Sequence, residues 1–147
     1  MIQLGNLDHI EKIERACGHV FNYRADVCIS RSHRGKLLGG VIYEGFTRAS
    51  IQAHVAGFAP FWLDRTLLWM MFDYPFNQLK VGRVFCQIKE TNFVALEFNA
   101  KLGFKEVTRI DGVFPEGACV LTELTRDDCR WLNLKPRMPN ERQERRT

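Results

Sequence analysis

The chain lacks the cysteine patterns of disulfide scaffolds and of zinc sites. Its five cysteines are an odd number, lie far apart and include no Cys-x-x-Cys pair, whereas disulfide frameworks use an even number of cysteines. Cys28 with His33, and Cys119 with Cys129, match no usual zinc spacing. We therefore expect free thiols, no metal site and a reducing, intracellular compartment.

A long hydrophobic run is also missing. The most apolar stretch is Thr66 to Phe72, far short of the roughly 20 residues that a membrane helix needs. Charged side chains such as Asp8, Glu11 and Lys12 interrupt the apolar positions near the N-terminus, which does not fit a secretory signal. These absences predict a cytoplasmic protein without a membrane partner.

Net positive charge is nearly absent outside the C-terminal end. Of the formal charge of +4, residues 135–147 supply five basic and two acidic side chains, a net of +3, and residues 1–134 carry 16 minus 15, or +1. A nucleic-acid-binding domain normally carries its basic patch on the folded part, so no nucleic-acid partner is expected. We expect a single domain over residues 1–132 and a polar, basic, solvated tail over residues 133–147.

Hydrophobic and aromatic residues, by contrast, are plentiful. They make up 46% of the 147 residues, with eleven Phe and three Trp. A chain of this length and composition can bury the core of one domain, and it does not resemble a disordered protein.

The hydrophobic periodicity predicts alternating helices and strands in one mixed α/β domain. Helices are expected over 8–17, 63–76, 91–104 and 125–132, and strands over 25–30, 36–44, 51–56, 83–89, 104–110 and 118–124. Asp64 suits the N-cap of the second helix, and Pro75 suits its end. Because strands 51–56 and 83–89 are joined through that helix, they should be parallel neighbours.

A motif on the third predicted helix carries a family resemblance. Asn92-x-x-Ala95 is followed by Lys101-Leu102-Gly103-Phe104, and with the element order this resembles the GNAT N-acetyltransferases, above all the branch that acetylates protein N-termini. The likeness spans roughly residues 8–132. Three further segments resemble small acetyltransferase-like proteins of phages and prophages, namely 73–76, 77–79 and 128–132.

The resemblance implies the GNAT fold, a mixed and mostly antiparallel sheet with helices on both faces that splays between strands 51–56 and 83–89. It implies acetyl-CoA in that cleft, with coenzyme A as product. The pantetheine arm would pair with the backbone of Val55, Ala56 and Gly57. The pyrophosphate would rest on the helix start formed by Leu63, Arg65 and Thr66, because a helix N-terminus offers free N–H groups and the positive end of its dipole.

Three features of the expected cofactor site have alternative interpretations. Asn92 would direct its amide toward the cofactor by family analogy, although N-capping alone also explains an Asn at a helix start. The segment 60–66 has no glycine where the family carries several, and Asp64 would repel a phosphate if it faced inward. Asn99 stands where many members place a Tyr that protonates the leaving thiolate, and an amide cannot supply that proton.

His54 and Glu44 are the candidate general bases. Strand 51–56 places His54 on its polar face at the cleft, and imidazole suits proton transfer near neutral pH. The alternative is an ordinary strand histidine with a hydrogen-bonded ring. Glu44, at the end of the preceding strand, could act through a bound water; the alternative is a solvent-exposed carboxylate.

Two functions follow from the sequence. The first is acetyl transfer from acetyl-CoA to a primary amine (a protein N-terminus, a lysine or a small amine) by direct attack in a ternary complex. The second is a catalytically degenerate GNAT-fold protein of a phage or prophage, in the host cytoplasm, that binds a protein partner or has a structural role. The sequence specifies neither the acceptor nor the oligomeric state. A homodimer that pairs through the last strand is one of the open possibilities.

Overall fold

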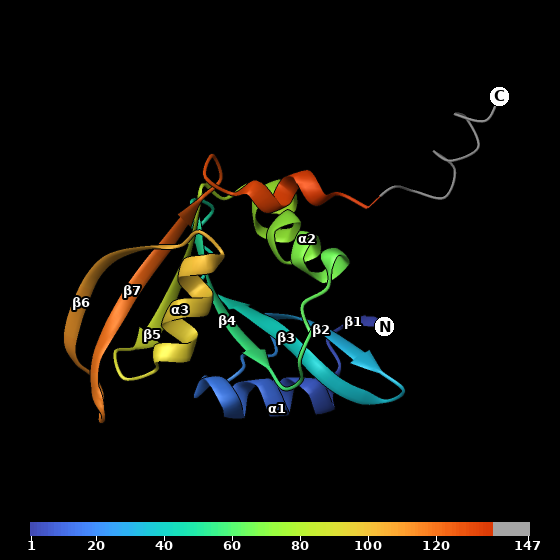
Figure 1. Ribbon diagram of the computed structural model, residues 1–147, viewed down its shortest axis with the longest axis horizontal. Helices are drawn as coiled ribbons and strands as arrows, with labels where there is room; N and C mark the ends of the chain where they lie inside the picture. Colours follow the sequence, from blue (N-terminus) through green and yellow to red (C-terminus); the bar gives the residue numbers. More distant parts are fainter. Residues whose placement is uncertain (137–147) are drawn as a thin grey trace.

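The structure, a computed structural model, describes residues 1–136; the predicted tail falls largely outside this range. Figure 1 follows the elements in chain order. They are β1 (Ile2–Leu4), α1 (Leu7–Cys17), β2 (Val27–His33), β3 (Lys36–Glu44), β4 (Ser50–Gly57), α2 (Arg65–Asp73), a π-helical turn (Tyr74–Gln78), β5 (Arg83–Lys89), α3 (Phe93–Lys101), β6 (Lys105–Phe114), β7 (Gly117–Thr125) and a 3₁₀ helix (Arg130–Leu134).

The seven strands form one sheet in the order β1-β2-β3-β4-β5-β7-β6. Every neighbouring pair is antiparallel except β4 and β5, which are parallel as predicted. These two strands pair only where Ser50–Gln52 faces Arg83–Phe85. Beyond that point they diverge (Figure 1), so the sheet opens into two arms. The predicted mixed and mostly antiparallel sheet, which splays between these two strands, is confirmed.

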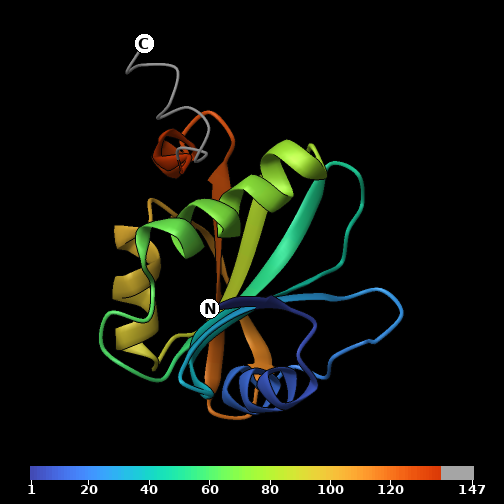
Figure 2. The same ribbon diagram turned by 90° about the vertical axis from the view of Figure 1, so that its right-hand side faces the viewer.

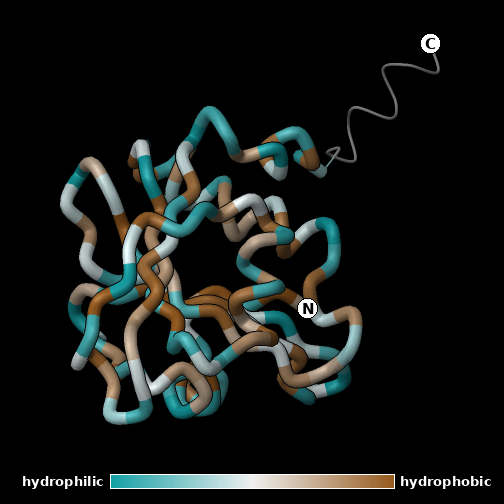
Figure 3. The backbone as a smooth tube through the Cα atoms, turned by 60° about the vertical axis from the view of Figure 1, so that its left-hand side comes forward, coloured by the Kyte–Doolittle hydropathy of each residue, from teal (hydrophilic) through white to brown (hydrophobic). Residues whose placement is uncertain are grey.

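Helices cover both faces of the sheet and create two hydrophobic clusters. Helix α2 crosses one face, and α1 lies beneath the other (Figure 2). The larger cluster includes Leu67, Phe72 and Phe76, all almost fully buried, and the smaller centres on Ile10 and Ile13 of α1. Hydrophobic stretches accordingly run through the interior, whereas hydrophilic ones occupy outer turns (Figure 3). Burying each such side chain contributes roughly 1.5–3 kcal/mol.

Close approach of neighbouring atoms explains why β3 contains two glycines. A Cβ at Gly40 would lie 2.7 Å from the Ile29 carbonyl oxygen, and a Cβ at Gly39 would lie 2.3 Å from the Trp62 ring. Neither contact leaves room for a side chain. The partner strand β2 carries a β-bulge between Arg31 and Ser32.

Helix α2 ends at Asp73, two residues before Pro75, in agreement with the prediction that this proline ends the helix. The chain continues through the π-helical turn, in which the Leu79 amide donates to the Tyr74 carbonyl at 3.0 Å. Pro75 stands in the first turn of this segment, where its missing N–H leaves no interior bond unmade. The buried Asp73 carboxylate also accepts hydrogen bonds from the Asn77 and Gln78 side chains.

Both ends of the described chain differ from the prediction. The short strand β1 was not predicted, and the α1 cap is Asn6, which accepts from the His9 amide at 3.1 Å, rather than Asp8. The predicted helix over 125–132 was wrong in position, because a turn follows Thr125 and only the 3₁₀ helix forms. Among residues 1–136, no helix has the length and hydrophobicity to cross a bilayer.

Candidate active site

A cavity of about 270 Å³ lies where β4 and β5 part. Its walls come mainly from the end of α1, from β4 with His54 and Val55, from β5 with Ile88, and from α3, and side chains of β3, α2 and β6 complete the lining. The position is a consequence of topology. Residues 53–57 of β4 have no strand partner on the β5 side, so backbone N–H and C=O groups on that edge are available to an extended ligand.

One of these backbone groups has a weak partner. The Cys17 thiol, at the end of α1, donates to the Val55 carbonyl at a sulfur–oxygen distance of 3.6 Å. Burial raises the pKa of Cys17 to about 11, so the group is a neutral thiol at physiological pH. The thiol forms part of the cavity wall and is not an activated nucleophile.

His54 and Glu44 are brought together on the α1 side of the sheet. Glu44 faces Gln52 across β3 and β4, so His54, two residues further, is its diagonal neighbour on the same face. The two side chains contact directly, with His54 Nε2 and Glu44 Oε1 2.7 Å apart. The imidazole is 13% exposed and lines the cavity.

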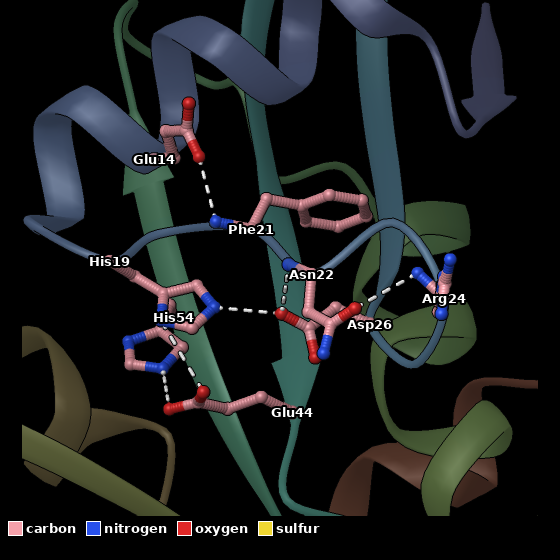
Figure 4. A network of polar contacts seen from close by, with 8 residues as sticks. All are labelled: Glu14, His19, Phe21, Asn22, Arg24, Asp26, Glu44 and His54. Carbon is pink, nitrogen blue, oxygen red and sulfur yellow. Dashed lines mark hydrogen bonds and ion pairs between the residues drawn. The ribbon is translucent and has the colours of Figure 1, made fainter.

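A second histidine joins this pair from the loop after α1 (Figure 4). The His19 ring stacks on the His54 ring with centroids 4.4 Å apart. Its Nδ1 lies 3.3 Å from Glu44 Oε2, and its Nε2 lies 2.9 Å from Asp26 Oδ2. Asp26 also accepts from the Asn22 amide at 2.9 Å, which fixes the carboxylate in place.

The loop is held in place by contacts at its start. Gly18 ends α1 in the left-handed conformation, with φ of 69°, which suits a residue without a Cβ. The Phe21 amide donates to Glu14 Oε2 at 2.7 Å (Figure 4), and the Phe21 ring is buried against the α1 cluster. These contacts turn His19 toward β4.

The facing wall is mostly apolar, with two asparagines. Asn92 caps α3 as predicted, accepting from the Ala95 amide at 3.2 Å, and it lines the cavity. Asn99 is buried in the same wall. Burial raises the pKa of the neighbouring Cys86 thiol to about 12, while a hydrogen bond from the Asn99 side chain acts in the opposite direction. Cys86 is buried.

The N-terminus of α2 carries its own anion. Asp64 accepts from the Leu67 amide at 2.8 Å, and Arg31 Nε lies 3.2 Å from the Asp64 carboxylate. Arg31 also donates to the Phe61 and Trp62 carbonyls at 2.9 Å. Phe61 adopts a positive φ of 59°, so this glycine-free loop still reaches the conformation that favours glycine.

The predicted site residues fall into three groups. His54, Val55 and Asn92 line the cavity, and Glu44 contacts it through His54. Ala56 is buried against α1, and Gly57 lies against the Trp62 indole, where a Cβ would be 2.1 Å from a ring atom. Leu63, Arg65 and Thr66 lie at the start of α2, outside the residues that line the cavity.

Sequence reasoning missed His19 and Asp26. Both belong to an irregular loop, and no periodic pattern assigns a direction to their side chains. The one local signal was Gly18, which predicts the end of α1 but not the path that follows it. The metal-ligand candidates considered from sequence all contained cysteine and did not include either residue.

No protein-family model and no curated protein sequence matches the chain. Solved structures do match. Ard1 of Thermoplasma volcanium aligns with a TM-score of 0.65 at 13% identity, over 85% of this chain and 96% of that one. The N-acetyltransferase PseH of Campylobacter jejuni, solved with acetyl coenzyme A, gives 0.59 at 15%, over 86% and 99%. Spermidine N-acetyltransferase of Vibrio cholerae, solved with CoA and spermine, gives 0.60 at 18%, over 87% and 79%. At these identities the likeness establishes the GNAT acetyltransferase fold.

Proposed function

We propose that the protein is an acetyl-CoA-dependent N-acetyltransferase acting on a primary amine by direct attack in a ternary complex. One observation carries the proposal: the cavity between β4 and β5 places an open strand edge beside the His54–Glu44 pair. The fold shared with acetyltransferases solved with acetyl-CoA or CoA supports it.

The cleft fits the pantetheine arm of acetyl-CoA. An extended, amide-containing chain can pair with the unpartnered edge of β4 around Val55, as an added strand would. At the start of α2, the Leu67 amide is already bonded to Asp64, but the amides of Arg65 and Thr66 belong to the first turn and have no intrahelical acceptor. These two amides, with the Arg65 side chain, would hold the pyrophosphate.

The residues of the β4 wall would accept the proton that the amine loses. When Nε2–H of His54 donates to Glu44, the lone pair on Nδ1 is the one that accepts a proton, and the carboxylate stabilises the imidazolium that forms. Acetyl-CoA would supply the acetyl group as a thioester: the amine nitrogen bonds to the carbonyl carbon, and the carbon–sulfur bond breaks. Asn99 supplies no proton to the departing sulfur, so that proton comes from solvent.

Calorimetric titration with acetyl-CoA, followed by assay of free thiol release with amine acceptors, tests this function. A polyamine, a peptide α-amine and a lysine side chain span the acceptor classes. We expect saturable binding, a raised melting temperature and turnover with at least one class. If millimolar acetyl-CoA gives neither a heat of binding nor a raised melting temperature, the proposal is wrong.

A binding protein without catalysis is the second candidate. The observation that favours it is the Asp64–Arg31 ion pair at the expected pyrophosphate position, because a carboxylate there opposes a phosphate. Asp64→Asn keeps an N-cap and removes the negative charge. If the enzyme proposal holds, this variant should bind acetyl-CoA several-fold more tightly. If neither the natural protein nor Asp64→Asn binds acetyl-CoA, the binding function stands.

A further inference from the structure

The cluster of His19, Glu44 and His54 has the composition of a metal site. Two imidazoles and one carboxylate are a common ligand set for Zn²⁺, with a fourth position left open. One ligand atom from each residue can be chosen so that all three lie within 4.8 Å of one another. Tetrahedral coordination with bonds of about 2.1 Å places ligand atoms roughly 3.4 Å apart. Because the two rings stack nearly parallel and each lone pair lies in its ring plane, the rings must turn out of the stack to direct both lone pairs at one ion.

The hydrogen bonding of His19 is incomplete without a cation. Its two ring nitrogens face two different carboxylates, Asp26 at 2.9 Å and Glu44 at 3.3 Å. A neutral imidazole has only one N–H, so one nitrogen would turn its lone pair toward an anion. A metal ion between Nδ1 and Glu44 converts this repulsion into two coordinate bonds. A second proton on the ring is the competing solution.

The surroundings fit a metal ion in three further respects. Asp26 can accept from Nε2–H of His19, which is the carboxylate–histidine–metal arrangement that orients imidazole ligands. The two carboxylates together balance a divalent charge. The side chains of His19, His54 and Asp26 are 12%, 13% and 5% exposed, so water competes weakly for the site.

We propose that His19 Nδ1, His54 Nε2 and the Glu44 carboxylate bind one divalent transition-metal ion of the Zn²⁺ class. Asp26 holds His19 in the ligating tautomer. Because His54 lines the cavity, the ion lies at the cavity wall and its fourth position is open to a water or a ligand donor atom. An ion on Nε2 of His54 replaces the N–H that donates to Glu44 and leaves the ring proton on Nδ1, so the metal-bound form is distinct from the form that would carry out acetyl transfer, and metal binding is tested without an acetyl-transfer assay.

The test is metal titration of the full chain after removal of bound metal by EDTA. With Zn²⁺ in a calorimeter, we expect one ion per chain. With Co²⁺, we expect the visible absorption of a four- or five-coordinate nitrogen and oxygen site. Glu44→Gln and His19→Ala should remove the Co²⁺ absorption, and Asp26→Asn should weaken Zn²⁺ binding about 10–100-fold.

His33→Ala is the matched control, because His33 is an exposed histidine at the end of β2; it should leave binding unchanged. Glu44→Gln is nearly isosteric, so it tests the site even if His19→Ala unfolds the chain. No saturable uptake by the natural protein would mean that the cluster holds a proton and not a metal. Uptake that persists in both His19→Ala and Glu44→Gln would place the ion elsewhere. Either result overturns the proposal.

Discussion

The two walls of the cleft differ in chemistry although both begin at the same pair of strands. The β4 wall presents ionisable groups: His54 contacts Glu44, and His19 bridges to Asp26. The wall formed by β5 and α3 presents mainly apolar side chains and neutral amides, with Lys89 as its charged residue. Asn99 is buried there next to Cys86. The groups proposed for proton transfer and for metal binding all lie on the first wall.

The difference follows from what each wall packs against. The α1 side of β4 meets an irregular loop, whose turns admit polar side chains and water. The β5 wall meets a helix and the main core, where an uncompensated charge would be costly. The cleft is therefore expected to respond differently to mutations on its two sides, and the following experiments test that contrast.

The largest effect is expected for His54→Ala. Loss of a general base should lower turnover about 10²- to 10⁴-fold, with acetyl-CoA affinity nearly unchanged because the side chain acts on the amine. Steady-state assay in EDTA, together with calorimetric titration, measures both quantities. His33→Ala, the exposed histidine of β2, should match the natural protein. Unchanged turnover in His54→Ala would remove it from the mechanism.

A smaller effect, and one on stability, is expected for Asn99→Ala on the other wall. The substitution removes a buried amide and its bond to the Cys86 thiol, which should cost about 1–3 kcal/mol of unfolding free energy. Turnover of the folded variant should change less than tenfold. Denaturant unfolding and the same assay check this. A drop in turnover as large as that of His54→Ala would break the contrast between the walls.

The smallest effect concerns the thiols of the two walls. Burial raises the pKa of Cys17 to about 11 and of Cys86 to about 12, from an ordinary 9.0. The folded state therefore keeps protons that the unfolded chain loses. This stabilising contribution is complete below about pH 9 and is lost as pH rises toward the folded-state values.

Urea unfolding at several pH values between about 8 and 11 should reveal the decline, and Cys86→Ala should make the slope shallower. The thiols should also resist iodoacetamide at neutral pH in the native protein. Rapid alkylation of Cys86 under native conditions would show that the β5 wall is more open than its packing indicates.

Local chemistry explains which parts of the fold were predictable. Asp64 and Asn92 were identified as caps because an N-cap depends on the few residues that follow it. The parallel pairing of β4 and β5 was predictable from their helical connection. The end of α2 near Pro75 was predictable, because proline disfavours helical geometry at the residue before it. The π-helical turn that follows was not predictable, because it is accompanied by contacts of buried Asp73 with the Asn77 and Gln78 side chains.

The candidate site was only half predictable. His54 and Glu44 could be named separately, because each stands on a recognisable strand, but their contact depends on the β3–β4 register. His19 and Asp26 had no such signal. A loop conformation is set by contacts such as that of Phe21 with Glu14, which join residues of different elements.

The sequence by itself determined the mixed α/β class, the order of the elements from α1 to β7, the N-caps of α2 and α3, and the strands that border the cleft. These follow from periodicity and from interactions within a few residues. Only the tertiary structure decided that two histidines and two carboxylates meet beside the cavity, and that Asp64 pairs with Arg31 at the start of α2. Those contacts join residues distant in the chain, and their geometry exists only after the sheet has formed its register and the loops have packed against it.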